Sequence, residues 1–180
     1  MMSGPETTRP QRARLQVEAK LAGALRSSLG RFVTGVAVLT FEAEEGPRGM
    51  TVNSFTSVSL DPPLILVSVA KTSRSHDLLA GGVPFTVNIL GAEQEALARH
   101  FTRRGSELAV RWDLEASSPH LVGTLAHFEC VPWRSYDAGD HTLALGEVVE
   151  FSAREGDALG FFTSRFLPVS EDRLGHEDLF

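Results

Sequence analysis

Residues 49–63 read GMTVNSFTSVSLDPP, and their alternation predicts a strand that ends at the Asp61-Pro62-Pro63 corner. One face of that strand is mostly apolar and suited to a core: Met50, Val52, Thr56, Val58 and Leu60. The other face carries hydroxyl and amide groups around one aromatic ring: Thr51, Asn53, Phe55, Ser57 and Ser59. A solvated strand face usually carries charges, and this one carries none. Such a face suits a flat polar ligand. On this stretch alone, an ordinary exposed Ser/Thr-rich strand explains it equally well.

Length and composition predict one globular domain. The chain has 180 residues, 42% hydrophobic and 22% charged. We expect a disordered leader over residues 1–13, a single domain over 14–169 and an acidic tail over 170–180. The formal net charge of −6 argues against nucleic acid or an anionic membrane as the main partner. No apolar run approaches the ~20 residues of a membrane span. The single cysteine, Cys130, fits a reducing compartment, so the expected location is cytoplasmic.

The hydrophobic pattern predicts a mainly β (α+β) chain with helices placed singly between strands. Strands are expected over residues 32–41, 50–60, 64–70, 85–90, 121–131, 141–152 and 161–169. Helices are expected over residues 14–29 and 93–101, with a short one capped by Ser73 and closed by Gly81-Gly82. Residues 105–119 are predicted as a long excursion and 133–139 as a loop. About six dominant strands favour an antiparallel barrel with flanking helices over regular βαβ alternation.

Several common catalytic motifs are missing from the sequence. It contains no dinucleotide fingerprint, no phosphate loop of the G-x-x-x-x-G-K-[ST] type and no G-x-S-x-G elbow. The six histidines show neither H-E-x-x-H nor a paired Cys/His spacing, so no metal site is predicted.

The best candidate for binding an anion is residues 71–75. Lys71, one of only two lysines, is followed by Thr72, Ser73, Arg74 and Ser75 at the start of a predicted helix. Backbone N–H groups and an arginine there favour a phosphate. On its own, the segment is slightly better explained as an ordinary capped helix start with solvated basic residues. If strands 50–60 and 64–70 are neighbours in a meander, this segment lies beside the polar strand face.

Two further polar features are ambiguous when taken alone. Gly139-Asp140-His141 enters a predicted strand, and Asp140 could orient the imidazole so that its other nitrogen faces a ligand. Spacing alone favours a simple turn with an exposed histidine. Asn88 points away from the face preferred by Phe85 and Val87, so it needs a partner if it is buried.

Taken together, these segments resemble the flavin reductase-like family with the FMN-binding split-barrel fold. Its members include the small reductase components of two-component flavin-dependent monooxygenases. The resemblance runs from about Leu25 to about Val169. It rests on GRFVTGVAVLT at 30–40, the segment 49–63, VNIL at 87–90, the helix ending in Phe101, and GDH at 139–141 leading to LGEV at 145–148.

The resemblance implies a six-stranded antiparallel split β-barrel and an NAD(P)H:flavin oxidoreductase, usually a homodimer. Such an enzyme reduces FMN or FAD by hydride transfer from NADH or NADPH and supplies the reduced flavin to a partner monooxygenase or halogenase. It implies flavin contacts on the polar strand: Thr51, Val52, Asn53, Ser54, Ser57, Val58 and Ser59. It implies phosphate contacts from Lys71, Thr72, Ser73 and Ser75, and further flavin contacts from Asn88 and Phe101. His141 and Asp140 are associated with the nicotinamide side as catalytic residues.

Some alternatives stay open at the level of sequence. A bulge near Ser54 would decide whether Ser54 or Phe55 faces the flavin ring. A split-barrel flavoprotein could instead hold flavin tightly and reduce another substrate, or bind flavin without turnover. Neither FMN over FAD nor NADH over NADPH is favoured.

Overall fold

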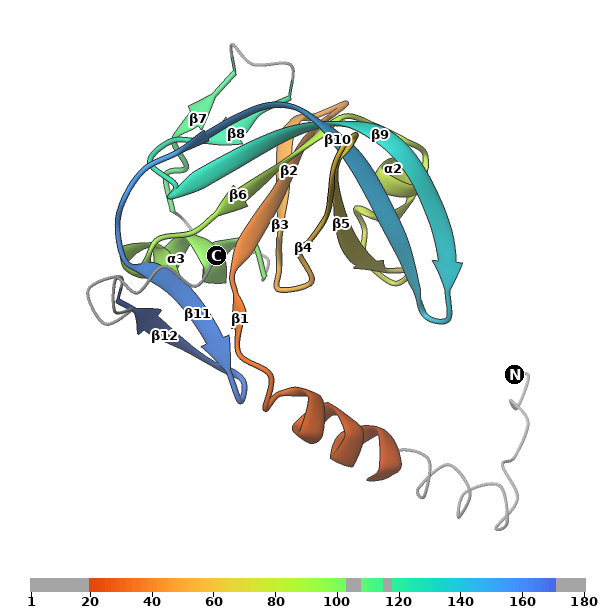
Figure 1. The fold of residues 1–180 in the computed structure, drawn as a ribbon, viewed down its shortest axis with the longest axis vertical. Coiled ribbons are helices and arrows are strands. Elements are labelled where there is room, and N and C mark those ends of the chain that lie inside the picture. Colours follow the sequence, from red (N-terminus) through yellow and green to blue (C-terminus); the bar gives the residue numbers. More distant parts are fainter. Residues whose placement is uncertain (1–19, 103–107, 115–117, 171–180) are drawn as a thin grey trace, which may run out of the picture.

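The computed structural model describes residues 20–102, 108–114 and 118–170. Its main body is one antiparallel sheet with the strand order β3-β2-β6-β9-β10-β5-β4 (Figure 1). The bounds of these strands are, in chain order, β2 (Ala37–Ala43), β3 (Gly46–Val52), β4 (Thr56–Leu60), β5 (Pro63–Ala70), β6 (Phe85–Ile89), β9 (Ala126–Ala138) and β10 (His141–Ala153). The edge strands β3 and β4 are consecutive in the chain. The sheet must therefore curl until its two edges lie within reach of a three-residue connection, which makes a split barrel.

Smaller elements surround this barrel. A three-stranded sheet has the order β1 (Thr34–Gly35), β11 (Ala158–Phe162), β12 (Arg165–Val169), and β7 (Trp112–Asp113) pairs with β8 (His120–Leu121). The helices are α2 (His76–Ala80), the 3₁₀ turn η1 (Ala92–Gln94), which leads into α3 (Glu95–His100), and the segment 20–29, which projects away from the barrel (Figure 1).

Strand β2 is buried on both faces because it serves two cores. Leu39 and Phe41 pack inside the barrel with Val67 and Val87. Val38, on the opposite face, belongs to a second core formed with α3, β8 and β11: Val36, Leu90, Ala98, Leu121 and Leu159. This explains why the sequence of this strand is apolar almost without interruption.

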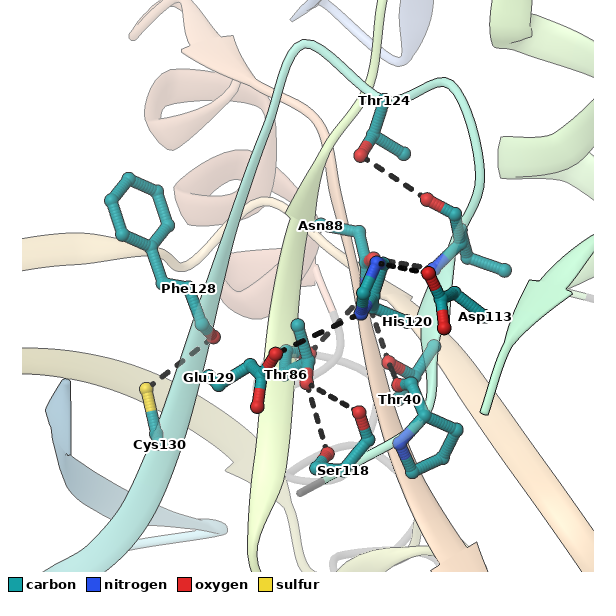
Figure 2. Close-up of polar contacts among 12 residues, drawn as sticks. Thr40, Thr86, Asn88, Asp113, Ser118, His120, Thr124, Phe128, Glu129 and Cys130 are labelled. Atoms are coloured by element: carbon teal, nitrogen blue, oxygen red, sulfur yellow. Dashed lines mark hydrogen bonds and ion pairs between the residues drawn. The ribbon is translucent and has the colours of Figure 1, made fainter. Parts of the chain in front are cut away.

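A buried polar network crosses the second core (Figure 2). Asn88 is fully buried, and its Nδ2 donates to the Val38 carbonyl and to Thr40 Oγ1, both at 2.9 Å. Its Oδ1 accepts from the Leu121 backbone N–H at 2.8 Å. The amide therefore joins β6 to β2 and β8, and it meets the requirement that a buried polar group be paired.

The fold class predicted from the sequence is confirmed, and the predicted boundaries need four corrections. The predicted strand 50–60 is broken at residues 53–55 into β3 and β4. The predicted loop 133–139 is wrong, because those residues continue β9 against β10 as far as the two-residue turn Gly139-Asp140. The predicted strand 161–169 is the hairpin β11–β12, turned by Thr163 and Ser164 with φ of 46° and 64°. The main sheet has seven strands rather than six, and the β7–β8 pair lies within the predicted excursion and the start of the strand predicted over 121–131.

Most other predicted features agree with the structure or lie outside the described residues, and the start of the short helix differs by two residues. The corner at Asp61-Pro62, the pairing of β4 with β5 and the strand β10 are as expected. The short helix begins after Ser75 rather than Ser73. The predicted leader 1–13 and residues 171–180 of the predicted tail are outside the described residues. In the described part of the chain, no helix is long and apolar enough to cross a membrane.

The Asn88 network leads to a prediction about stability. In Asn88→Ala, the Leu121 N–H and the Val38 carbonyl lose a buried partner, so we expect the free energy of unfolding to fall by about 2–4 kcal/mol. The control is Asn53→Ala, which changes an exposed asparagine and should cost less than about 0.5 kcal/mol. Urea unfolding of both variants measures this, and equal midpoints would contradict it.

Candidate functional site

The break between β3 and β4 sets the direction of each side chain on the polar segment. The Ser54 hydroxyl donates to the Ser68 carbonyl at 3.0 Å and accepts from the Ser68 N–H at 3.1 Å, fastening the break to β5. Phe55 turns toward the barrel core and stacks on Phe128, with ring centroids 5.8 Å apart. Asn53 is left exposed at the corner. The local deviation expected near Ser54 is therefore a full interruption of the strand, and the Phe55 ring is used in packing.

A polar cleft of about 430 Å³ lies next to β3. It is lined by residues 47–50, 73–75 and 100–102. Gly49 is required there, because a Cβ at this position would lie 2.6 Å from a ring carbon of Phe101. The Thr51 hydroxyl donates to the Ala98 carbonyl at 2.7 Å, which holds β3 against α3. The strand, the 71–75 segment and the end of α3 thus converge on one cavity.

The chemistry of the polar cleft suits an anion. Arg74 is an exposed cation on its wall, and Arg48 is paired with Glu45 at 2.6 Å. The Nδ1 atom of His100 is buried and has no hydrogen-bond partner among the described residues. Helix α2 has only five residues. The positive potential therefore comes from side chains rather than from a helix N-terminus, unlike the expectation from sequence.

An apolar cleft of about 620 Å³ opens on the other side of Asn53. Its walls are residues 32–37 and 53–56 with Ile89 and Phe128. The Oγ1 atom of Thr34 is buried there and has no hydrogen-bond partner within the described residues. A small third cleft shares Thr102 with the polar cleft and Val36 and Asn53 with the apolar cleft. The three cavities therefore form a band along β3 and the break, polar at one end and apolar at the other.

The β9–β10 turn holds a third group of polar residues. His141 Nδ1 lies 2.7 Å from Asp140 Oδ1. This hydrogen bond, followed by the charges of His141 and Lys71, lowers the pKa of Asp140 below its ordinary value. Asp140 therefore stays ionised and fixes the imidazole with Nδ1–H as donor, so Nε2 is the nitrogen left to meet a ligand. His141 is 41% exposed in its side chain, so a ligand can reach it.

Lys71 belongs to this turn and not to the polar cleft. Its backbone N–H donates to the Asp140 carbonyl at 2.9 Å and its Nζ to the Gly139 carbonyl at 2.7 Å. It also forms an ion pair with Asp137 of β9. The ammonium group of Lys71 is therefore held by the β9–β10 hairpin. It is not placed to bind a phosphate in the polar cleft.

The structure brings together most, but not all, of the residues predicted to form the site. Seven line the cleft band: Thr51, Val52, Asn53, Ser54, Ser73, Ser75 and Phe101. Lys71, Asp140 and His141 share the β9–β10 turn. Five lie elsewhere: Ser57, Val58 and Ser59 on edge strand β4, Thr72 exposed beside Lys71, and Asn88 in the second core.

The positions of four of these five residues have identifiable reasons. The break at 53–55 carries β4 to the opposite sheet edge from β3, and a register shift between Ser57 and Ser59 changes the direction of that strand again. Ser59 Oγ accepts from the Asp61 N–H at 3.2 Å, which makes it part of the β4–β5 corner. Asn88 has no exposed surface, and both ends of its amide are bonded within the protein.

Some cleft residues were missed from the sequence. Arg48 is two positions before Met50 and so shares its strand face, which was a usable signal. Arg74 was noted within the anion segment but not counted among the contacts. Phe32 and Val33 lie in the 30–40 segment that carries the resemblance but were not named as contacts, and His100 and Thr102 carried no signal, because they reach the band only through the packing of α3.

Comparison with known proteins places this arrangement in a family. The sequence profile of the "Flavin reductase like domain" matches residues 29–170. The chain is 46% identical over 145 residues to the "FMN reductase (NADH) SmoA" of Agrobacterium fabrum, covering 79% of this chain and 83% of that one.

Solved structures agree with this assignment. The styrene monooxygenase flavin reductase of Pseudomonas putida S12 superposes with a TM-score of 0.74 at 40% identity, covering 79% of this chain and 95% of that one. The NADH:FAD oxidoreductase of Streptomyces globisporus C-1027, solved with NAD and FAD fragments, superposes with a TM-score of 0.78 at 40% identity, covering 86% and 96%. On the profile match, the sequence identity and the shared split barrel, the chain belongs to the flavin reductase-like family.

Proposed function

We propose that this protein is an NAD(P)H-dependent flavin reductase that supplies reduced flavin to a partner monooxygenase. The observation that carries the proposal is the cleft band along β3, with cationic and hydroxyl groups at one end and apolar walls at the other. FMN and FAD have the same division, a charged phosphate chain joined to a flat ring system. The family relatives named as FMN and FAD reductases support the same assignment.

The residues of the band fit a flavin. Arg74, with the hydroxyls of Ser73 and Ser75, would hold a phosphate in the polar cleft. The unpaired Nδ1 of His100 and Oγ1 of Thr34 would each gain a partner from a polar ligand, which removes the cost of burying them alone. Phe32 and Val33 would cover an aromatic ring system at the apolar end. Bound flavin supplies the hydride acceptor. The chain's own residues bind the flavin, orient it and exclude water from it.

His141 is proposed to act on the nicotinamide side. Its ring is oriented by Asp140 and reachable from solvent, so Nε2 could hydrogen-bond to NADH or NADPH and help to position it. Positioning is what hydride transfer demands from the protein, because no general acid is needed at the moment of transfer.

We also propose that the enzyme is a cytoplasmic homodimer. Leu21, Leu25 and Leu29 form an exposed apolar stripe on the projecting segment 20–29, and Phe32 is 78% exposed at its end. Apolar surface grouped in this way is typical of a protein–protein interface. Light scattering tests the dimer by measuring the molecular mass in solution. A chain with a single cysteine, Cys130, cannot form an intrachain disulfide, which suits the cytoplasm.

The proposed activity is tested by an activity matrix. We expect flavin-stimulated oxidation of NADH or NADPH in the presence of FMN, FAD or riboflavin, and free reduced flavin passing through a membrane that retains the protein. Absence of turnover with every pairing would contradict the reductase assignment. Flavin that stays bound through gel filtration and is reduced without being released would favour a flavoprotein acting on another substrate.

The phosphate role of Arg74 gives a prediction with an internal control. Arg74→Ala should raise KM for FMN by about five- to tenfold, because a charge-assisted hydrogen bond is lost at an exposed site. KM for riboflavin, which has no phosphate, should stay unchanged. The matched variant Arg134→Ala, which removes an exposed arginine from β9, should affect neither flavin. Equal changes in KM for FMN and riboflavin would remove the phosphate role.

The role of His141 is tested by separating nicotinamide use from flavin binding. His141→Ala should lower kcat/KM for the reduced nicotinamide by about tenfold and change the flavin dissociation constant by less than about twofold. Asp140→Asn should have a smaller effect, because asparagine still accepts the hydrogen bond from Nδ1 but loses the charge. Unchanged kcat/KM for both NADH and NADPH in His141→Ala would remove this residue from the reaction.

A further inference from the structure

His120, Asp113 and Glu129 lie close together beside β9 (Figure 2), and the ring of His127 stacks on His120 to complete a cluster of two histidines and two carboxylates away from the cleft band. His127 and Glu129 are two positions apart on β9 and so share one strand face. His120 comes from β8, and Asp113 is its pairing partner on β7. The rings of His120 and His127 stack with centroids 4.0 Å apart. The cluster thus joins the β7–β8 hairpin to the main sheet.

The distances from the His120 ring nitrogens to the two carboxylates are too long for ordinary hydrogen bonds. His120 Nδ1 lies 3.9 Å from Glu129 Oε1, and His120 Nε2 lies 3.6 Å from Asp113 Oδ2. The Nδ1 atom is buried and lacks a hydrogen-bond partner within the described residues. Glu129 is only 5% exposed. A buried imidazole nitrogen without a partner is costly, and the cost is removed if a ligand or ion supplies one.

We propose that His120, His127 and Glu129 bind a divalent late first-row transition metal ion such as Zn²⁺. One ligand atom from each residue lies within 4.8 Å of the others. Ligand atoms held about 2.0–2.2 Å from a tetrahedral ion are roughly 3.3–3.6 Å apart, so small side-chain movements would close the site. Two imidazoles and one carboxylate are a ligand set that zinc accepts.

The residue that must move most has room to do so. Because the two rings are nearly parallel, at 15°, their nitrogens do not converge on one point. His127 is only partly buried and lines a cleft of about 240 Å³ with His120 and residues 121–125 and 152–154. Rotation of the His127 ring into that cleft would turn a nitrogen toward His120 Nδ1 and Glu129, and the cleft leaves space for a water as fourth ligand.

The metal would act as a clamp between strands and take no part in hydride transfer. The cleft at His127 shares no lining residue with the polar and apolar clefts. The ligands come from β8 and β9, so an ion would fix the hairpin to the sheet and stabilise the folded state. Sequence spacing did not indicate this site, since the third ligand is brought in by strand packing and not by a local motif.

Metal binding to the purified full-length protein tests the proposal. After treatment with EDTA and dialysis against micromolar Zn²⁺, we expect about one equivalent of zinc per chain by mass spectrometry, and a rise in Tm of several degrees. Substitution with Co²⁺ should give the visible absorption bands of a tetrahedral nitrogen- and oxygen-ligated ion.

Substitution of individual ligands tests whether the zinc ion binds at this cluster. His127→Gln changes a partly exposed residue and should fold normally, yet weaken zinc binding at least tenfold and abolish the rise in Tm; Glu129→Gln should do the same. His141→Ala, which removes a histidine from the far turn, should bind zinc as the unaltered protein does. Less than about a tenth of an equivalent in the unaltered protein, or equal affinity in His127→Gln, would overturn the proposal and leave a stacked histidine pair between two carboxylates.

Discussion

The pair of hydrogen bonds between the Ser54 hydroxyl and the backbone of Ser68 is the contact on which the barrel depends. β3 and β4 are the two edges of one sheet, and only residues 53–55 connect them. A continuous strand over 50–60 would place both halves at the same edge and leave the sheet open. By satisfying one N–H and one carbonyl of β5, Ser54 replaces ladder bonds that the interruption removes. The sheet can then turn its two edges toward one another without orphaned backbone groups.

The same interruption shapes the cleft band that we propose as the binding surface. A regular strand would direct Asn53 and Phe55 to one face, but here Phe55 packs on Phe128 and Asn53 stays at the corner. The corner at Asn53 borders the apolar cleft and the small third cleft, which in turn shares Thr102 with the polar cleft. The strand carries hydroxyl and amide groups from Thr51 onward, while the positive charge comes from Arg48 at the start of β3 and from Arg74 on the segment after β5. A ligand with a charged chain and a flat ring meets each part of this surface with matching chemistry.

Sequence reasoning succeeded where periodicity and turn residues act locally. The corner at Asp61-Pro62, the strand β10 and the mainly β class follow from alternation and proline. Sequence reasoning failed where the secondary structure of a segment is decided by the strand with which it pairs. Residues 133–138 resemble a loop in composition, but hydrogen bonding to β10 makes them a strand. The β11–β12 turn uses Thr163 and Ser164 at positive φ, which neither residue type indicates. Residues 37–41 of β2 are buried on both faces, and apolar apart from Thr40, because the strand faces two cores.

The candidate site shows the same limit. Lys71, Ser73 and Ser75 are close in sequence and were predicted as one phosphate group. The structure divides them, because the end of β5 pairs with β10 and draws Lys71 onto the carbonyls of that turn. Asn88 has the right type for a ligand contact, but both ends of its amide are hydrogen-bonded to β2 and β8. The sequence gives no reason to group His120 with His127. In the folded chain β8 brings the ring of His120 onto that of His127 on β9.

The division at Lys71 also links the two halves of the proposed reaction. Its backbone and side chain hold the carbonyls of Asp140 and Gly139, so the turn that carries His141 cannot move independently of the end of β5. Two residues later the same segment enters the polar cleft at Ser73. The turn that carries His141, the residue proposed to meet nicotinamide, is therefore hydrogen-bonded to the short segment that carries the proposed phosphate group. Hydride transfer requires a fixed separation between donor and acceptor. Hydrogen bonds between the His141 turn and the 71–75 segment help to keep that separation without a dedicated nucleotide-binding domain.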